Sequence, residues 1–294
     1  MRLRIGSPGA EPLSPAPGGG VVQVWQDEAG VSLAYGWADG RWLWIGWPGV
    51  AAFRFSESQD DTVVSAFPDR GGSRDSIEDV FSRIILPIAL QARGFEALHA
   101  SAVVMDDGAV AFCARTKTGK STLAHALANR GCAQLADDAV VLEFGANGVT
   151  VVPLPFLPRL KSPRPREVGA GHEGAGAPSC VRRKRVPLRA VVLMNRSADD
   201  SDHQPVALVE RLGPSRAFPS VLAHAHCFDL AGRDSRARLL ERYLDLVETV
   251  PVLDLTFRPG LDLLPAVVDV VVHSIGTLCD AANAIARRKD NGGN

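Results

Sequence analysis

The stretch Ala114-Arg-Thr-Lys-Thr-Gly-Lys-Ser121 decides how this chain is interpreted. It follows an apolar run at 109–113 that is typical of a strand, and it leads into a helical pattern from Lys120 to about Asn129. Apart from Ala114, it matches G-x-x-x-x-G-K-[S/T], the loop between a strand and a helix that holds nucleotide phosphates. The sequence therefore predicts a P-loop at this point of the chain.

The residue types of this loop each have a physical reason. Gly119 lets the backbone approach the phosphates, whose oxygens accept from loop amides next to the positive end of the helix. Lys120 reaches the β- and γ-phosphates, and the Ser121 hydroxyl binds Mg²⁺. If the first loop position needs a positive φ, Ala114 costs on the order of 1 kcal/mol there. The predicted nucleotide contacts are Ala114, Arg115, Thr116, Lys117, Thr118, Gly119, Lys120, Ser121 and Thr122.

Two adjacent carboxylates, Asp137 and Asp138, come after the next apolar strand, 17 and 18 residues beyond Lys120. A P-loop site needs one carboxylate near the metal. Two suggest a division of labour, in which the second accepts a proton from an attacking hydroxyl. His99 lies on the strand expected to pair with the strand that enters the loop, where a histidine is more often a structural hydrogen-bonding group than a catalytic one.

Together these residues resemble the catalytic core of HPr kinase/phosphorylase. The resemblance is greater to the shorter HPr-kinase-related proteins of peptide-biosynthesis clusters, which include the lasso-peptide precursor kinases. The shared pattern is a His-led strand, a hairpin, G-x-[ST]-x-x-G-K-S, a helix ending in Arg-Gly, and then Leu-x-Asp-Asp. In this chain it consists of His99, Thr116, Gly119-Lys120-Ser121, Arg130-Gly131 and Leu135-Ala136-Asp137-Asp138, within a similarity covering about residues 76–195.

The resemblance implies an α/β fold with a compact P-loop core related to phosphoenolpyruvate carboxykinase, and the use of ATP and Mg²⁺. It implies that Asp137 is the general base, that Asp138 helps Ser121 to hold Mg²⁺, and that His99 borders the site. The related kinases also have counterparts of the segments that contain Arg159 and Lys184, which are therefore candidates for phosphate or substrate contacts. The E-x-R-G segment that the bifunctional enzyme uses for phosphorolysis is not found, and Glu167 is only loosely nearby. This difference favours a kinase alone.

Outside the motif, the composition and residue pattern of the sequence predict three regions. Residues 1–20 are rich in Pro, Gly and Ser and are expected to lack fixed structure. Residues 21–75 contain all five tryptophans and predict a small antiparallel sheet, in which the aromatic side chains form core and sheet surface. The kinase core is expected over 76–294. It begins with a helix that starts at Ser76, where Ser76 and Asp79 resemble a capping box, and that ends at Gly94.

The rest of the core is predicted from short patterns. The expected elements are hairpins at 97–113 and 140–152, a buried strand at 188–195, a strand at 252–257, and helices at about 214–222, 235–247 and 261–287.

A basic segment interrupts the core at 159–187. From Arg159 to Arg189 the sequence holds nine Lys and Arg residues against two Glu, on a chain whose net charge is −1. Two interpretations stay open for this Pro- and Gly-rich stretch. It is either a solvated loop or a mobile lid that meets phosphates or an acidic acceptor.

Composition excludes several classes of protein. The chain has 32 Lys and Arg against 33 Asp and Glu, a balance that argues against a nucleic-acid or anionic-membrane binder. No stretch is apolar for long enough to span a bilayer, and the N-terminus lacks the apolar core of a secretory signal. Five cysteines without a C-x-x-C spacing disfavour a zinc cluster or a disulfide framework. We therefore expect a cytoplasmic protein with reduced thiols.

The motif favours an ATP- and Mg²⁺-dependent kinase that acts on a serine hydroxyl of a protein or peptide. By the resemblance, the acceptor includes ribosomally made peptide precursors such as lasso peptides, and the chain forms a homo-oligomer. The alternative is a nucleotide-binding regulatory partner without turnover, which Ala114 and the missing E-x-R-G acid favour and which the intact Asp137-Asp138 pair opposes. A small-molecule kinase is a third interpretation, disfavoured by the long stretch ahead of the loop.

Overall fold

The structure is a computed structural model that describes residues 1–7, 21–26, 30–154, 184–197, 205–227 and 233–290. Side chains at 21–22, 233–235 and 278–290 are not described. The chain is a mixed α/β protein that divides into two units. The first consists of Met1–Ala97, Leu154–Phe156 and Ala225–Arg242, and the second of Leu98–Pro153, Leu157–His224 and Tyr243–Asn294. This division differs from the boundary expected at residue 76, because the helices that follow residue 73 join the first unit.

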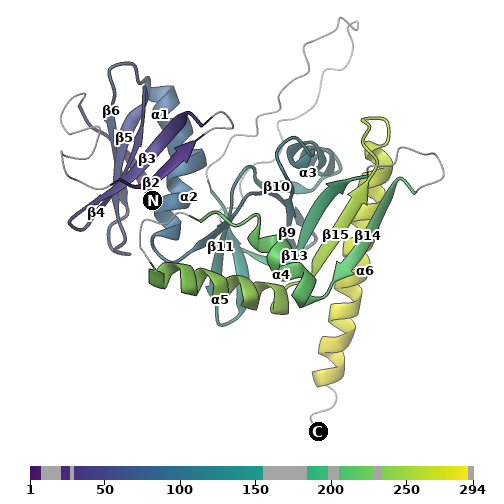
Figure 1. Ribbon diagram of the computed structural model, residues 1–294. Helices are drawn as coiled ribbons and strands as arrows, with labels where there is room; N and C mark the ends of the chain where they lie inside the picture. Colours follow the sequence, from purple (N-terminus) through teal and green to yellow (C-terminus); the bar gives the residue numbers. More distant parts are fainter. Residues whose placement is uncertain (8–20, 27–29, 155–183, 198–204, 228–232, 291–294) are drawn as a thin grey trace, which may run out of the picture. The chain divides into compact units, whose positions relative to one another are not determined.

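A six-stranded sheet forms the first unit, as the alternating aromatic and β-branched runs predict (Figure 1). Its order is β1-β6-β5-β4-β3-β2, and β2 to β6 form an antiparallel meander in which each strand pairs with the next. The bounds are β1 (Arg2–Ile5), β2 (Val21–Gln26), β3 (Ser32–Asp39), β4 (Trp42–Trp47), β5 (Ala51–Ser56) and β6 (Val63–Pro68).

Strand β1 corrects the expectation that residues 1–20 lack fixed structure. Residues 2–5 pair in parallel with β6, so that Arg2 lies opposite Val63. The Arg2 amide donates to the Thr62 carbonyl at 2.8 Å, and the Gly6 amide donates to the Ala66 carbonyl at 2.8 Å. The short run also alternates exposed and half-buried residues, as an edge strand does. Residues 8–20 lie outside the described part of the chain.

One helical stretch follows the sheet and packs on one of its faces (Figure 1). It consists of α1 (Arg74–Val80), the π-helix η1 (Phe81–Ile85) and α2 (Leu86–Gln91). The N-cap is Ser73 and not Ser76, whose amide donates to the Ser73 hydroxyl at 3.1 Å. A wider π turn precedes Pro87, which has no N–H for the helical ladder. The stretch ends before Gly94, whose φ of 91° suits glycine.

Stacked aromatic rings lie on the sheet of the first unit. Tyr35, Trp37 and Trp44 stack with centroids 5.8 and 5.5 Å apart, and Phe67 continues the row 5.5 Å from Trp44. The Arg54 guanidinium lies 5.4 Å from the Trp44 ring centroid and 5.2 Å from that of Phe67. Trp37 and Trp44 belong to a buried cluster, and their rings therefore act as core.

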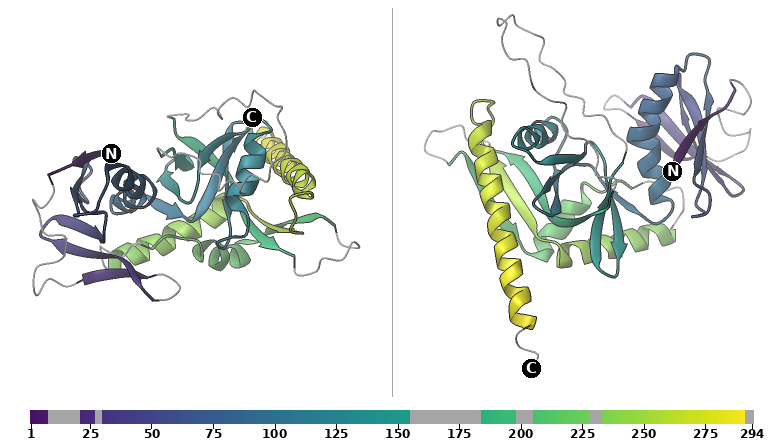
Figure 2. Two further views of the ribbon diagram at one scale, coloured as in Figure 1. Left: turned by 90° about the horizontal axis from the view of Figure 1, so that it is seen from above. Right: turned by 180° about the vertical axis from the view of Figure 1, so that it is seen from behind.

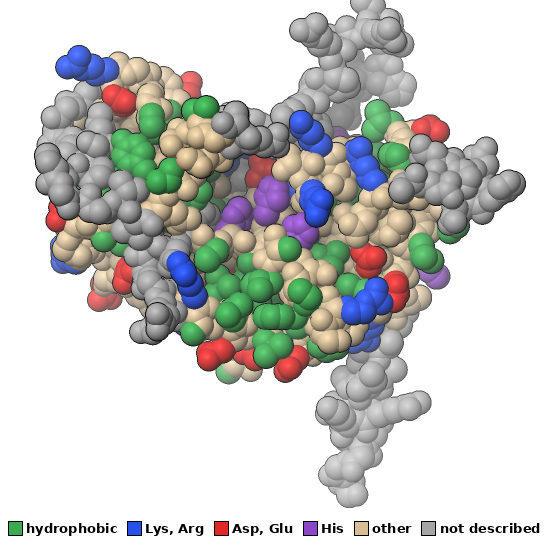
Figure 3. Space-filling model, viewed as in Figure 1, with side chains coloured by type: hydrophobic (Ala, Val, Ile, Leu, Met, Phe, Trp, Pro, Cys, Tyr) green, Lys and Arg blue, Asp and Glu red, His purple; other side chains and the backbone are tan. Residues whose placement is uncertain are grey.

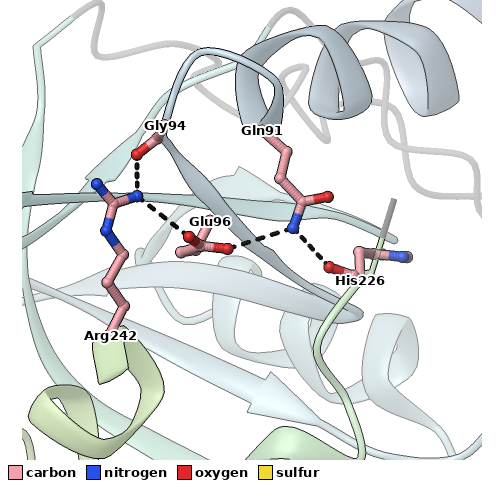
Figure 4. A network of polar contacts seen from close by, with 5 residues as sticks. All are labelled: Gln91, Gly94, Glu96, His226 and Arg242. Carbon is pink, nitrogen blue, oxygen red and sulfur yellow. Dashed lines mark hydrogen bonds and ion pairs between the residues drawn. The ribbon is translucent and has the colours of Figure 1, made fainter. Parts of the chain in front are cut away.

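A buried carboxylate joins three segments of the first unit (Figure 4). Arg242 donates to Glu96 at 3.1 Å and also to the Gly94 carbonyl. Gln91 donates both to Glu96, at 3.2 Å, and to the His226 carbonyl, at 2.7 Å. Burial raises the pKa of Glu96, while its partners Gln91 and Arg242 act in the opposite direction. The network fixes the end of the helical stretch against residues far along the chain.

The second unit is built on a mixed sheet. Its order is β10-β8-β9-β13-β12-β11, with β15 paired to β13 and β14 paired to β15. The bounds are β7 (Glu96–Leu98), whose residues are divided between the two units, β8 (Ala100–Met105), β9 (Gly108–Cys113), β10 (Ala133–Ala136), β11 (Val140–Gly145), β12 (Gly148–Val152), β13 (Val186–Arg196), β14 (Ala207–Leu212) and β15 (Val252–Phe257). The predicted hairpins, β8–β9 and β11–β12, are confirmed. Strand β14 was not predicted.

Two helices cover one face of this sheet (Figure 2). Residues of α3 and α6 share one buried cluster with β9, β13 and β15. The helices are α3 (Lys120–Ala128), α4 (Pro214–Leu222), α5 (Arg233–Thr249) and α6 (Leu264–Asp290), close to their predicted bounds. Within the described residues, no helix combines the length and the apolar character that crossing a bilayer requires.

Candidate nucleotide-binding site

Strand register brings the predicted site residues to one end of the second sheet. In the β8–β9 hairpin, Ala100 pairs with Cys113, so the start of β8 lies beside the end of β9. Strand β10 runs antiparallel to β8, and Ala136 pairs with Ala102. His99, which lies just ahead of β8, the loop that begins at Ala114, and the Asp137-Asp138 pair therefore meet at the same sheet end.

The strand–loop–helix arrangement predicted around 109–128 is confirmed by β9 and α3. Gly119 is the N-cap of α3 and has a φ of 119°, a conformation that a side chain would strain. Ala114 is 1% exposed and does not have a positive φ, so its methyl group meets no backbone penalty. The left-handed non-glycine residue of the loop is Lys117, with a φ of 68°.

Lys120 is the buried cation of the site, with 7% of its surface exposed. Its ammonium donates to the Ala114 carbonyl at 3.0 Å and lies 3.0 Å from His99 Nε2. Burial lowers the pKa of Lys120, and the nearby carboxylates, Asp138 foremost, partly oppose that shift. The Lys120 side chain therefore connects the start of α3 to the first residue of the loop.

The hydrogen bonds of His99 define its protonation. Its Nδ1 lies 3.1 Å from the Asp138 carbonyl, which only accepts, so Nδ1 carries the proton. Its Nε2 is then the acceptor for the Lys120 ammonium. Burial and the Lys120 charge lower the pKa of His99, which favours this neutral tautomer. A protonated His99 would place two cations against each other.

We expect the stability of the folded chain to fall as the pH drops below about 6.5, the ordinary histidine value. Because the pKa of His99 is lowered in the folded state, the unfolded chain takes up that proton first. Urea unfolding at about pH 7.5 and about pH 5.5 measures the difference. The variant His99→Gln should lose part of it. An equal pH dependence in parent and His99→Gln would contradict this prediction.

A carboxylate links the helix start to strand β8. The Asp137 Oδ1 atom accepts from the Ser121 hydroxyl at 2.8 Å and from the buried Ser101 hydroxyl at 2.7 Å. Asp138 follows with a φ of 67°, a conformation that Asp tolerates better than most residues. The two carboxylates thus occupy different surroundings. Asp137 accepts a hydrogen bond from Ser121, whereas Asp138 is the carboxylate that raises the pKa of Lys120 most.

The donor set fits a magnesium ion. A serine hydroxyl beside carboxylates presents the oxygen ligands that Mg²⁺ takes, with phosphates and water completing its shell. Ser121, with Asp137 or Asp138, would hold it. Among the described residues no group of three or more His, Cys, Asp and Glu is placed to bind a metal by itself, and a P-loop site needs no such group.

The thiol of Cys113 is no nucleophile at neutral pH, because burial raises its pKa to about 12.

Three residues that the sequence did not indicate also belong to the site. Ser101 is the one hydroxyl in the apolar strand 100–105, a signal that was readable. Arg196 contacts the loop from the end of β13. His224 accepts from the His99 amide at 2.7 Å through its carbonyl, and burial followed by the charges of His99, Lys120 and Arg115 lowers its pKa. Figure 3 shows histidine side chains beside Lys and Arg side chains on the visible face.

The two remaining predicted contacts, Arg159 and Lys184, differ in what the structure says of them. Arg159 lies outside the described residues, as does the segment 155–183 that holds most of the basic stretch. Lys184 is exposed and precedes β13, whose parallel register with β9 puts Leu188 opposite Ala109, at the sheet end away from the loop. Arg185, from the same basic stretch, pairs with Glu143 at 2.6 Å.

Comparisons with known proteins give a distant similarity. No protein-family model matches the sequence, and no curated protein matches it. Among solved structures, the chain is similar to the Hpr(Ser) kinase/phosphatase from Coxiella burnetii, with 15% identity over 67% of this chain and 95% of that chain, at a TM-score of 0.31. A likeness of this size does not carry an argument about activity, and the case for function rests on the geometry of the site.

Proposed function

We propose that the chain is an ATP-dependent kinase that phosphorylates a serine hydroxyl of a protein or peptide. One observation carries the proposal. The loop ahead of α3, its buried Lys120 and the carboxylate of Asp137, hydrogen-bonded to Ser121, meet at one end of one sheet. A phosphate-binding loop next to a hydroxyl–carboxylate pair provides both halves of a phosphoryl-transfer site, the anion cradle and the metal and proton chemistry.

The phosphate side of the reaction belongs to the loop and to Lys120. The amides at the start of α3 have no acceptor within their own helix and can donate to phosphate oxygens, whereas the Thr118 amide of the loop donates to the Arg115 carbonyl at 3.2 Å. The Lys120 ammonium would leave the Ala114 carbonyl and His99 and turn to the β- and γ-phosphates. His99 Nε2 then remains as an acceptor beside the site, able to receive a donor from the bound substrates.

The two carboxylates share the metal and the proton. In the assignment implied by the resemblance, Asp137 takes the proton and Asp138 with Ser121 holds Mg²⁺, which supplies charge neutralisation of the phosphates. The hydrogen bond from Ser121 to Asp137 favours the opposite assignment, because a carboxylate bound to a metal-ligating hydroxyl lies next to the metal. Both assignments use the same pair, and substitution of each residue distinguishes them.

Transfer of the γ-phosphoryl group follows the same bond changes in either assignment. The acceptor oxygen bonds to the γ-phosphorus, the bond from that phosphorus to the β–γ bridging oxygen breaks, and the hydroxyl proton passes to the Asp carboxylate. ADP and a phosphoserine result. A carboxylate base suffices because the hydroxyl becomes acidic only as its bond to phosphorus forms.

The acceptor class is proposed from the resemblance, and a ribosomally made peptide precursor is its most specific form. The competing proposal is a regulatory partner that binds nucleotide without turnover. Ala114, which favoured that alternative, is accommodated without a positive φ, so the loop carries no backbone defect at that position.

The decisive experiment measures turnover and binding in the same preparation. The chain is incubated with ATP and Mg²⁺, with and without a library of serine-containing peptides, and ADP release and phosphoserine are quantified. The kinase proposal expects ADP release that increases with acceptor and a phosphoserine product. Calorimetric binding of ATP without any ADP release or product would select the regulatory alternative, and no binding would exclude both.

A further inference from the structure

An arginine of the neighbouring strand β13 contacts the loop of the candidate site. Its residues Ala190, Val192 and Met194 point into the buried cluster shared with α3, because every second side chain of a strand faces the same side. Arg196 is the next residue in this phase and lies just beyond the buried cluster. Strand β13 runs parallel to β9, with Leu193 opposite Cys113, so the end of β13 lies beside the start of the loop.

The Arg196 guanidinium donates to two consecutive carbonyls at the tip of the loop, those of Lys117 and Thr118. Its Nε donates to the Thr118 carbonyl at 3.1 Å, and its Nη2 donates to the Lys117 carbonyl at 2.8 Å. Lys117 has a φ of 68°, a left-handed conformation that is unfavourable for a residue with a side chain. The arginine therefore binds the carbonyl of the very residue whose backbone is least favourable.

We propose that Arg196 is a positioning residue that holds the P-loop in its phosphate-binding shape. In a trans peptide the carbonyl of one residue and the N–H of the next point in opposite directions. Carbonyls of Lys117 and Thr118 that are held toward Arg196 turn the amides of Thr118 and Gly119 away from it, and the Thr118 amide donates to the Arg115 carbonyl within the loop at 3.2 Å. This inference rests on the proposed nucleotide site and adds to it a residue that no motif contains.

The role of Arg196 follows from what Lys120 does. Lys120 donates to the Ala114 carbonyl at the start of the loop, and in the proposed function its ammonium turns from there to the phosphates. Arg196 contacts the tip from outside and does not have to move. A planar guanidinium can donate to two carbonyls at once, whereas a lysine ammonium at the same place would be a single point donor.

The first experiment needs no nucleotide. Amide hydrogen exchange is measured for the parent chain, for Arg196→Gln and for Arg196→Lys, with Arg211→Gln as a control in which an exposed arginine of β14 loses the same charge. Faster exchange confined to residues 115–119 in Arg196→Gln, and to a smaller extent in Arg196→Lys, is expected. Loop exchange equal to that of the parent overturns the inference, and so does faster exchange spread over the whole second unit.

The second experiment measures the anion cradle directly. Inorganic tripolyphosphate is titrated by calorimetry, and a Kd raised about tenfold in Arg196→Gln is expected, from the loss of two charged hydrogen bonds at an exposed site. In kinase assays KM for ATP should rise while kcat changes little. Equal affinity in Arg196→Gln and Arg211→Gln overturns the inference. If the parent binds neither tripolyphosphate nor ATP, the proposed function fails, and the exchange experiment alone decides whether Arg196 holds the loop.

Discussion

Substitution of Lys120 by alanine is expected to abolish phosphate transfer while the fold persists. Lys120 has 7% of its surface exposed and is the cation that we expect to meet the phosphates, so its loss removes a preorganised, buried charge from the site. Loss of such a charge lowers turnover by at least about 10³-fold. The fold should tolerate the change, because burial already disfavours the charged form of this side chain. Phosphoserine formation and calorimetric titration with an ATP analogue and Mg²⁺ measure the effect.

Two controls separate charge from shape in this prediction. Lys120→Met keeps most of the side-chain volume without the ammonium and should be as inactive as Lys120→Ala. Arg211→Ala removes an exposed cation of β14 and should behave as the parent does. Unchanged ATP affinity and unchanged transfer in both Lys120 variants would remove the P-loop assignment altogether.

The second large effect is expected at the carboxylate pair. Asp137→Asn keeps the size of the side chain and an oxygen that can accept from Ser121 and Ser101, but it cannot take a proton. If Asp137 is the base, this variant binds ATP and Mg²⁺ nearly normally and transfers phosphate at least about 10²-fold more slowly. Asp138→Asn should then require more Mg²⁺ for half-maximal activity.

A magnesium titration of both variants determines the roles. If Asp137→Asn is the variant that needs more Mg²⁺, and Asp138→Asn loses turnover at saturating Mg²⁺, the roles are exchanged, as the Ser121 contact favours. Asp245→Asn, on an exposed face of α5, is the control for loss of one negative charge. Transfer at the parental rate in both pair variants would contradict a catalytic role for either residue.

The sequence predicted best those features that are determined locally. The turn at Asp106, with a φ of 52°, closes the hairpin between Met105 and Gly108 where the Asp-Asp-Gly signature placed it. Gly119 is the N-cap of α3, and its φ of 119° is a conformation that glycine adopts without strain. The N-cap of α1 was missed by three residues, since Ser73 and Ser76 can both cap a helix and only the backbone of Ser73 is extended.

What the sequence could not predict depends on register between distant strands. Ser101 meets Asp137 only because β10 pairs with β8 in one particular alignment. Arg196 reaches Thr118 across 78 positions of the chain, and no pattern near either residue indicates that they meet. The motif thus predicts residues that stay proposed nucleotide contacts, while Ser101 and Arg196, which hydrogen-bond to residues of the motif, emerged only from the fold.

The pairing of β1 with β6 has a consequence for how the chain acquires its structure. Strands β2 to β6 join neighbours in sequence, so their contacts need only short loops to close, and such contacts form quickly. Strand β1 is made first but joins a partner that begins at Val63, and it cannot be placed until that partner exists. Until then β6 presents an open edge, which is where association with other chains competes with folding. The strand that comes first in the sequence of this sheet is thus the last to be placed in it.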